Sequence, residues 1–563
     1  MLSLKRTFRA SCVRAMLWTC IAFGAVGTWQ DAKADAETVV QGVLQLRWGD
    51  APRAPNGQAQ LPEQFEAWLD AGPGKRYALD VAQAKRAAGD LYALANRSVA
   101  VSYAAPAIVT SGAKVMAASG AVPVITAIVA ADKLPQRAQA VGVDGRVMAA
   151  AAVLGSTRWI TLMCKFADIA TEQKPRSFFQ DQYGNGVGQL GHYWNEVSYG
   201  KIDLAGSTAH GWYTLPKPRS AYVSEVAGKL KADLSQLFSD CSALADAEVD
   251  FRDVQGVNLM FNGELDGSAW GGGACATLDG SYTCTRVTWS PPWSFANLAP
   301  LAHEMGHGYG LPHSNNSDGD NDTYDNPWDL MSDAWRNATS NAVFGLLPKH
   351  INMYQRERLG WVAEARKRVI PAGNAASQDI VLDAGSLQNS SNTQLVVLAL
   401  PAQADPYSTE IYTLEARRRT GAYEANLAGD AVIIHRLKDY GIAYSVDQDD
   451  PAANFSSNEG SMLKVGERWN TPDESHWVEV VSSTANGFVV RVGPRPRAMS
   501  TPAPVLSSSS AATASSRPTT ASGSTPAAKK TTATAPRPVA RRSACDRLPA
   551  AVRFTALCNL LER

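Results

Sequence analysis

The sequence predicts a mixed α/β domain flanked by two β-rich domains, with a disordered spacer near the C-terminus. Its 563 residues are enough for about two to four domains. Helical and strand-like hydrophobic patterns alternate in the middle of the chain, whereas short β-type runs separated by Gly, Pro, Asn and Asp dominate on both sides. Large apolar residues almost disappear between residues 494 and 542, which predicts the spacer.

The composition excludes two broad classes of protein. Charged residues make up 19% of the chain, and 53 Lys and Arg balance 53 Asp and Glu, so no global field attracts nucleic acid or an anionic membrane. Hydrophobic residues make up 45%, which excludes a wholly disordered chain. We therefore expect recognition at a local site and no nucleic-acid partner. The composition says nothing of the oligomeric state.

Residues 1–34 have the pattern of a cleaved secretory signal peptide. Basic residues up to Arg14 precede an apolar run from Met16 to Val26, and a small-x-small cleavage site follows at Ala32–Ala34. No later stretch reaches about 18 apolar residues. We expect a secreted, extracellular protein, with the periplasm as the alternative location and no transmembrane anchor in the mature chain. An uncleaved N-terminal anchor is the competing interpretation.

The cysteines fit an exported protein. Cys12 and Cys20 lie in the predicted signal peptide, and the even number that remains favours disulfides. The remaining cysteines are Cys164, Cys241, Cys275, Cys284, Cys545 and Cys558. Pairing between sequence neighbours would join 275 to 284 and 545 to 558, and would leave 164 with 241. The spacing does not fix this connectivity, so other pairings stay open.

The mature chain begins with two predicted folded domains. Residues 35–156 start with the alternating run Val39–Leu46 and predict a β-rich N-terminal domain. Residues 157–362 combine a buried strand over Ile160–Cys164 with helical spacing over residues 221–245, which predicts an α/β (α+β) domain.

Three further segments complete the chain. Residues 363–493 contain short β runs separated by turns, which predict a compact β domain. Residues 494–542 are dominated by Ser, Thr, Pro and Ala and predict a low-complexity linker. Residues 543–563 regain apolar positions and predict a short C-terminal segment, for which a docking element and a frayed tail are the two alternatives.

The stretch from His303 to His313 carries the chemistry. On a helix, His303 and His307 project from one face, so their imidazoles can converge on one metal ion. Gly310 can adopt a positive φ that ends the helix and returns His313 as a third ligand. Glu304 is placed to take a proton from a metal-bound water. Three imidazoles with one open position predict a catalytic zinc site, because a structural site would need a fourth protein ligand.

The extended pattern resembles known zinc endopeptidases. The motif HExxHxxGxxH at residues 303–313, followed by Met331 within Trp328–Ser332, resembles the metzincin clan, in which a Met-containing turn lies beneath the metal. Other segments resemble the gametolysin and immune inhibitor A peptidase families, and the similarity covers roughly residues 157–493. These segments are Asn195–Lys201, Gly211–Pro216, Arg358–Trp361, Tyr412–Arg417 and Ala431–Arg436. His313 favours the gametolysin family.

This resemblance implies a metzincin-like catalytic domain, Zn²⁺ as cofactor and protein or peptide substrates. It implies that His303, His307 and His313 bind zinc, that Glu304 is general base and then general acid, and that Met331 supports the site. The alternative is a secreted binding or adhesive protein with a vestigial peptidase fold. The presence of Glu304 favours the enzyme, because a binding protein needs no general base.

Two further features near the motif allow functional interpretations. The run Asp318–Asp325 has carboxylates at alternate positions, which suits Ca²⁺, and a solvated acidic loop is the alternative. The strand Val257–Phe261 could present an open edge to an extended peptide, or it could be an ordinary interior strand. Side chains considered for stabilising an oxyanion are Tyr309, Tyr324 and Trp335.

The position of residues 35–156 before the catalytic pattern predicts a prodomain. We expect it to inhibit or chaperone the enzyme and to be removed by cleavage near residues 145–157, with a permanent accessory domain as the alternative. No cysteine lies between Ala34 and Thr157. A free thiolate from this segment therefore cannot occupy the fourth zinc position, so inhibition must use a carboxylate or steric cover.

Overall fold

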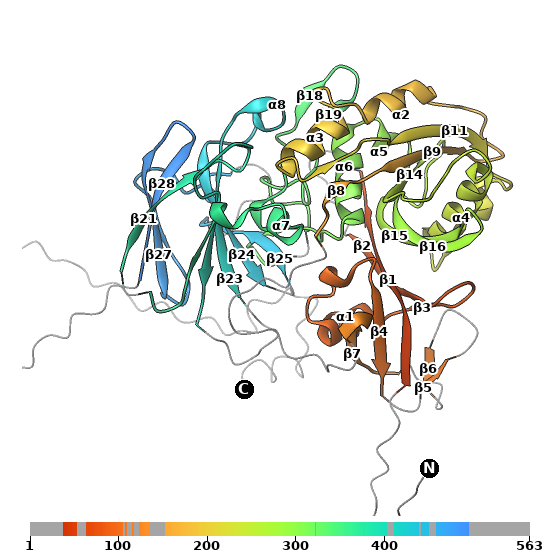
Figure 1. Cartoon of the computed structure of the whole chain (residues 1–563), viewed down its shortest axis with the longest axis horizontal. Helices are drawn as coiled ribbons and strands as arrows, with labels where there is room; N and C mark the ends of the chain where they lie inside the picture. Colours follow the sequence, from red (N-terminus) through yellow and green to blue (C-terminus); the bar gives the residue numbers. More distant parts are fainter. Residues whose placement is uncertain are drawn as a thin grey trace, which may run out of the picture. The chain divides into compact units, whose positions relative to one another are not determined.

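The computed structural model describes most of the chain between residues 38 and 494 (Figure 1). The described ranges are 38–52, 63–104, 107–109, 115–117, 123–133, 152–320, 322–374, 376–401, 410–438, 441–449 and 458–494. The predicted signal peptide, linker and C-terminal segment, with Cys545 and Cys558, lie outside these ranges. Within them, no helix is long and apolar enough to cross a membrane.

The largest sheet has ten strands and joins two separate parts of the sequence. Its main path runs β11-β9-β14-β16-β15-β1-β2-β3, while β4 pairs with β1 and β7 pairs with β4. The strands are β1 Thr38–Asp50, β2 Gln64–Asp70, β3 Arg76–Ala78, β4 Ser98–Tyr103, β7 Ile125–Ala130, β9 Trp159–Lys165, β11 Thr208–Thr214, β14 Gly256–Phe261, β15 Ala269–Leu278 and β16 Ser281–Ser290. The predicted strands over Val39–Leu46 and Ile160–Cys164 are confirmed as parts of β1 and β9.

Helices pack on both faces of the central part of this sheet. Alternate residues of β9 enter two different cores: Trp159 and Met163 pack with one, and Ile160 and Leu162 with the other. The first core contains residues of α2 (Arg176–Gln182), α3 (Leu190–Val197), α5 (Pro292–Phe295) and α6 (Leu298–Gly308), and the second contains those of α4 (Leu234–Ala245). Burial on both faces explains why β9 is almost continuously apolar.

The helix predicted over residues 221–245 is shorter than expected. Only α4 is helical, and Asp233 caps its N-terminus by accepting a hydrogen bond from the Gln236 amide. The preceding residues form a hairpin of β12 (Val223–Val226) and β13 (Lys229–Ala232). Ala227 and Gly228, both at positive φ, make its turn. The helical spacing of Val226 and Leu230 was misleading, because these side chains are 55% and 48% exposed.

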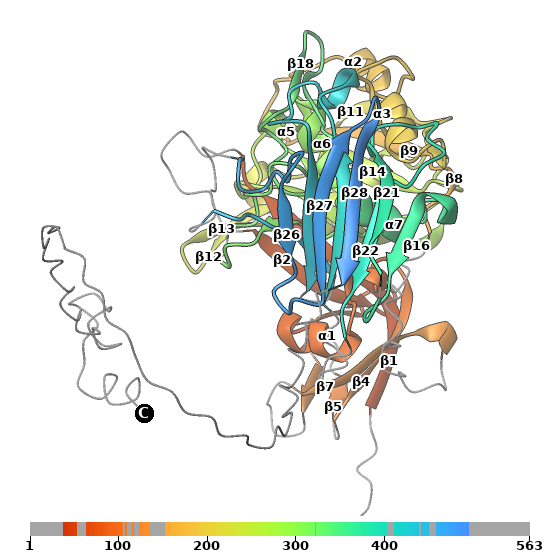
Figure 2. The same ribbon diagram turned by 90° about the vertical axis from the view of Figure 1, so that its left-hand side faces the viewer.

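Two further sheets form the C-terminal part of the described chain. A six-stranded sheet has the order β17-β25-β24-β23-β22-β20, and a four-stranded sheet, β21-β28-β27-β26, faces the viewer in Figure 2. Their strands are β17 Asn315–Asn316, β20 Lys367–Ile370, β21 Gln378–Asp383, β22 Leu395–Ala399, β23 Ile411–Arg417, β24 Ala431–Lys438, β25 Ile442–Ser445, β26 Arg468–Asn470, β27 His476–Ser483 and β28 Gly487–Pro494. Both sheets contribute to one hydrophobic core, as the short β runs predict.

Short elements complete the described fold. The additional paired strands are β5 Ala107–Val109 with β6 Val115–Ala117, β8 Gly155–Ser156 with β10 Ile202–Asp203, and β18 Thr339–Asn341 with β19 Gly345–Leu347. The remaining helices are α1 Val81–Ala88, α7 Met353–Arg358 and α8 Gly421–Glu424, with 3₁₀ turns at Tyr92–Leu94, Ala131–Lys133, Arg219–Ala221 and Glu364–Arg366.

Buried polar side chains connect the six-stranded sheet to residues 326–332. Arg417 of β23 donates to the Trp328 carbonyl at 2.5 Å, and the Asn326 side chain donates to Nε2 of His435, on β24, at 3.2 Å. His435 is 1% exposed, and burial lowers its pKa to about 4. The neutral imidazole is therefore the form that the folded chain holds.

Two disulfides lie in the described part of the chain. Cys164 of β9 is bonded to Cys241 of α4, and Cys275 of β15 is bonded to Cys284 on the adjacent strand β16. Both bonds join cysteines that follow one another in the sequence, which is the neighbour pairing considered from the sequence. The first closes a loop of 77 residues and the second a loop of 9, so they should constrain the unfolded chain very differently.

We predict that removing the Cys164–Cys241 bond destabilises the fold more than removing Cys275–Cys284. Loop-closure entropy alone makes the difference about 2 kcal/mol in unfolding free energy. Chemical denaturation of the two double Cys→Ala variants measures it. Equal stability of the two variants would contradict the prediction, and non-reducing peptide mapping of the wild type checks that both bonds form.

Acidification should destabilise the fold through His435. Its folded pKa, about 4, lies below the ordinary value of about 6.5, so the unfolded state takes up a proton first as the pH falls. Between pH 7 and pH 5 this costs about 2 kcal/mol of stability. We expect His435→Gln to remove most of that pH dependence in urea unfolding. The control variant His192→Gln, at a partly exposed histidine, should keep the pH dependence of the wild type. An unchanged slope in His435→Gln would show that another group is responsible.

Candidate metal centre and active site

Helix α6 holds two of the predicted ligands in a fixed position. His303 and His307 lie one helical turn apart, and all the helix residues from Leu298 to Gly308 are buried. Close packing on β15 holds the helix in place, because a Cβ on Gly271 would collide with the Glu304 carbonyl oxygen. The helix is therefore anchored by its apolar surroundings rather than by an N-cap side chain.

The turn after α6 brings His313 back toward the helix, as predicted. Gly310 has φ +88°, its amide donates to the His307 carbonyl at 2.9 Å, and the Leu311 amide donates to the Gly306 carbonyl at 3.1 Å. This pair of hydrogen bonds is a Schellman motif, which requires a residue at positive φ. The Leu311 carbonyl is then free to accept from Nδ1 of His307 at 2.7 Å.

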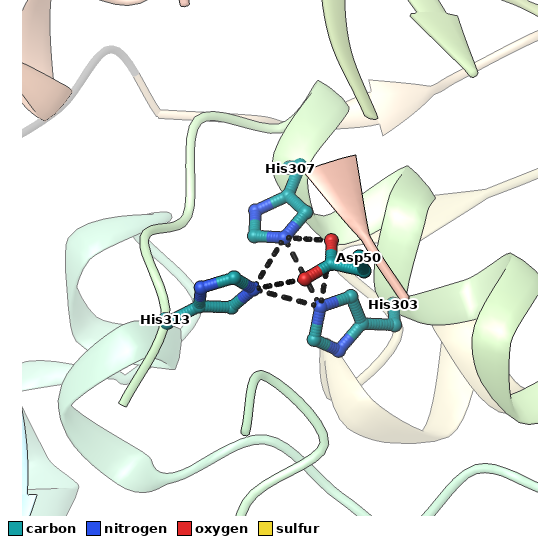
Figure 3. A group of neighbouring side chains, drawn as sticks. All are labelled: Asp50, His303, His307 and His313. Carbon is teal, nitrogen blue, oxygen red and sulfur yellow. Dashed lines mark hydrogen bonds and ion pairs between the residues drawn. The ribbon is translucent and has the colours of Figure 1, made fainter. Parts of the chain in front are cut away.

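The three predicted histidines meet at one point (Figure 3). Their Nε2 atoms lie 3.0, 3.1 and 3.2 Å apart, and each side chain is at most 3% exposed. Nδ1 of His303 contacts the Leu330 carbonyl at 2.6 Å, which leaves the Nε2 lone pair facing the other two rings. Tetrahedral ligands at zinc–nitrogen distances of about 2.0–2.1 Å lie about 3.3 Å apart, so the donor set fits a zinc ion.

Met331 packs against helix α6 near the histidines. The side chain is fully buried and contacts Gly306, on the helical turn between His303 and His307; a Cβ there would collide with its sulfur. The Met331 carbonyl accepts from the Ser314 amide at 3.0 Å. Met331 thus connects the helix to the segment that follows His313.

Glu304 lies beside the metal position in a dry environment. It is 1% exposed, and its Oε2 atom has no hydrogen-bond partner among the described residues. Burial, and secondarily the charge of Asp50, hold the pKa of this carboxyl well above its ordinary value. A carboxyl that favours its protonated form is suited to accepting a proton and passing it on.

The structure adds a fourth residue, Asp50 at the end of β1, to the three histidines (Figure 3). Its Oδ1 lies 2.8 Å from Nε2 of His313, and its Oδ2 lies 3.2 Å from Nε2 of His307 and 3.5 Å from Nε2 of His303. Together these four residues form the largest cluster of potential metal ligands in the described chain.

Two neighbours of Asp50 also contact the histidines. The Trp48 ring stacks on His307 with centroids 4.7 Å apart, and the Glu63 carboxylate accepts from Nδ1 of His313. No sequence spacing links these residues to the motif, because they lie far upstream in a different predicted domain. The only signal was indirect: the absence of cysteine from residues 35–156 left a carboxylate as the available inhibitory ligand.

The tyrosines and the tryptophan considered for oxyanion stabilisation occupy different places. Tyr324 donates to Oδ1 of Asp50 at 2.6 Å and packs against His313, so its hydroxyl lies beside the metal position. Tyr309 instead contacts Thr157 and Trp159, and Trp335 packs on Trp293. Tyr324 is therefore the candidate that the structure favours.

The strand suggested as an open edge for a peptide is an interior strand. β14, which contains Val257–Phe261, pairs with β9 on one side and β16 on the other. The interpretation as a substrate edge was wrong, because both backbone faces of this strand are already hydrogen-bonded. Strand β15, which packs against helix α6, pairs with β16 on one side. Its other side would be a free edge without β1, which pairs with it along Arg47–Asp50.

The described residues of the acidic run lie between His313 and Met331 and bring three carboxylates close together. Ligand oxygens of Asp318, Asp320 and Asp325 lie within 4.8 Å of one another. Asp325 is 2% exposed, and burial raises its pKa to about 8. Its Oδ1 accepts from the Asn316 amide at 2.6 Å, while Oδ2 has no hydrogen-bond partner within the described part of the chain.

Comparison with known proteins identifies the class of this protein. Residues 159–442, about half of the chain, match the family model of the gametolysin peptidases, M11. This is a family of metallopeptidases, so the site described above belongs to a protein-cleaving hydrolase that uses a metal ion. The chain belongs to the gametolysin peptidase family M11. No curated protein matches the chain.

Proposed function

We propose that this protein is a secreted, zinc-dependent endopeptidase of the metzincin type that cleaves extracellular proteins. The convergence of three imidazole Nε2 atoms within 3.2 Å of one another carries this proposal. Nitrogen donors in tetrahedral positions favour zinc, whereas Ca²⁺ and Mg²⁺ prefer oxygen. The predicted signal peptide and the two disulfides support export.

His303, His307 and His313 would hold the zinc ion. When bound there, zinc polarises the scissile carbonyl and lowers the pKa of water toward neutrality. The hydrogen bonds from Nδ1 of His303 and His307 to main-chain carbonyls fix the orientation of these rings and increase the basicity of Nε2. Met331 holds the helix and the returning segment together and does not touch substrate.

Glu304 would move the proton. Its carboxylate takes a proton from the attacking water and gives it to the nitrogen of the leaving amine, so no covalent enzyme intermediate is needed. Its burial favours this transfer, since a desolvated carboxyl holds the proton until the leaving group can accept it. The Tyr324 hydroxyl, beside the metal position, can donate to the oxyanion of the tetrahedral intermediate.

A second function, a binding protein with a vestigial peptidase fold, has one observation in its favour. Asp50 offers a carboxylate as a fourth ligand beside the three histidines, and four protein ligands are typical of structural zinc sites. A structural site, however, has no use for a buried carboxyl such as Glu304 with an unpartnered oxygen. Loss of this group from a binding protein would be neutral or stabilising.

We predict that Glu304→Gln keeps the zinc but lowers turnover by about 100- to 10,000-fold, because the ligands persist while proton transfer fails. His307→Ala should lose both metal and activity. Metal analysis, and cleavage of a peptide library before and after limited proteolysis of the chain, measure the two effects. Glu172→Gln, at an exposed surface pair with Lys165, is the matched control. Full turnover by Glu304→Gln would exclude the mechanism.

A further inference from the structure

We propose that the N-terminal part of the chain, residues 38–133, keeps the peptidase latent through Asp50. In this proposal, which rests on the proposed zinc peptidase function, the Asp50 carboxylate takes the fourth zinc position and strand β1 covers the edge that a substrate peptide needs. The proposal makes residues 38–133 a folded inhibitor that is covalently joined to the enzyme it blocks.

The Asp50 carboxylate is placed as a ligand, not as a chance neighbour. The residue is 6% exposed, and both of its oxygens point at the three histidine Nε2 atoms (Figure 3). Tyr324 fixes Oδ1, whereas Oδ2 has no hydrogen-bond partner in the ranges that the structure describes. A buried carboxylate oxygen without a donor is costly, and a cation at the centre of the cluster removes that cost.

A carboxylate in this position excludes catalysis. A catalytic zinc site has three protein ligands and one position for water or substrate, and a fourth protein ligand closes it. The attacking water then has no place beside Glu304. In this proposal the metal site of the folded chain is closed, although every residue of the catalytic motif is present.

Strand β1 blocks the approach of substrate as well. Arg47 to Asp50 pair antiparallel with Gly272 to Ala269 of β15. Gly272 permits this contact, because a Cβ there would collide with the Leu46 carbonyl. An extended peptide that adds to a sheet edge needs unpaired backbone groups, and along these four residues β1 already uses them. Trp48, stacked on His307, fills the space next to the metal position.

The inhibitory part has its own core. Leu44, Leu69, Val99 and Ile128 belong to a hydrophobic cluster separate from the two that surround β9. Its contacts with the rest of the chain include polar and ionic pairs, such as Asp90–Arg358 at 2.5 Å and Glu66–Lys231 at 2.9 Å. Interfaces between domains of one chain are commonly polar in part.

The first test uses the full-length chain loaded with Co²⁺, whose visible spectrum reports coordination. Acetohydroxamate, a small metal-binding probe, needs an open position on the metal. We expect Asp50→Ala to lower the dissociation constant of this probe by at least about tenfold, because the open state becomes the dominant one. Asp50→Asn, which preserves the shape of the side chain, should change it in the same direction. Asp70→Asn, in the same N-terminal part but bonded to Tyr282, is the matched control.

The outcomes separate latency from the proposed function. Equal probe affinity and equal cobalt spectra in wild type and Asp50→Ala would overturn the latency proposal. If Asp50→Ala binds the probe but the chain freed of residues 38–133 by limited proteolysis cleaves no peptide, latency of the metal site stands and the endopeptidase function fails. N-terminal sequencing of the active form gives an independent check: we expect it to begin after residue 133, and an active chain that still contains Asp50 in contact with the metal would also overturn the proposal.

A second inference concerns the acidic loop, and a different observation supports it. We infer that Asp318, Asp320 and Asp325 bind a calcium ion. Asp325 is 2% exposed and its Oδ2 atom has no hydrogen-bond partner within the described residues. One of its carboxylate oxygens lies within 4.8 Å of ligand oxygens of the other two. Calcium prefers oxygen ligands, and a buried carboxylate oxygen without a donor requires a cation or a proton. The loop carries Tyr324, so the ion would fix a residue beside the zinc position.

Calorimetric titration of Ca²⁺ into the chelator-treated, zinc-reloaded full chain tests this site. We expect one ion to bind, with a dissociation constant raised at least about tenfold in Asp325→Asn because a charged ligand is lost. Asp250→Asn, an exposed acid paired with Arg252, should bind as the wild type does. Terbium luminescence gives a second readout. Absence of binding at millimolar Ca²⁺, or equal binding by Asp325→Asn, would refute the inference.

Discussion

The convergence of three imidazoles on one point is the constraint on which the rest of this structure depends. Each ring donates its Nδ1 proton to an acceptor from a different segment: the Leu330 carbonyl before Met331, the Leu311 carbonyl in the turn after α6, and the Glu63 carboxylate near the N-terminus. A ring fixed in this way can present only Nε2 to the centre. The sheets and helices hold these acceptors in place, and two of them, the carbonyls of Leu311 and Leu330, lie outside residues 38–133 and stay with the peptidase.

Missing Cβ atoms make such close convergence feasible. Gly306 lets Met331 lie against α6, Gly271 lets α6 approach β15, and Gly272 lets β1 approach the same strand. A glycine inside a helix costs about 1 kcal/mol relative to alanine, so α6 would be a poor helix in isolation. Burial of nearly every residue around it provides the compensation, which means that the site forms only when the surrounding fold forms.

Local features of this protein could be predicted from its sequence, and long-range ones could not. The motif spacing predicted that His303, His307 and His313 would meet, and Gly310 predicted the turn, because these depend on helix geometry over a few residues. The strand pairing of β1 with β15 could not be predicted, since sheet register between distant segments leaves no local signal. The hairpin at residues 223–232 was missed for a related reason: apolar spacing does not show whether side chains are buried.

The chemistry of the cysteines favours a carboxylate as the inhibitory ligand that we propose. A thiolate would bind zinc more strongly than an aspartate does, because soft sulfur ligands favour this metal. The Cys164–Cys241 and Cys275–Cys284 bonds, however, require an oxidising environment, in which a free thiol near them could exchange or oxidise. Asp50 is inert to such chemistry. Its weaker bond to the metal is offset by the pairing of β1 with β15, so the inhibitory strand gains specificity from the sheet rather than from the ligand alone.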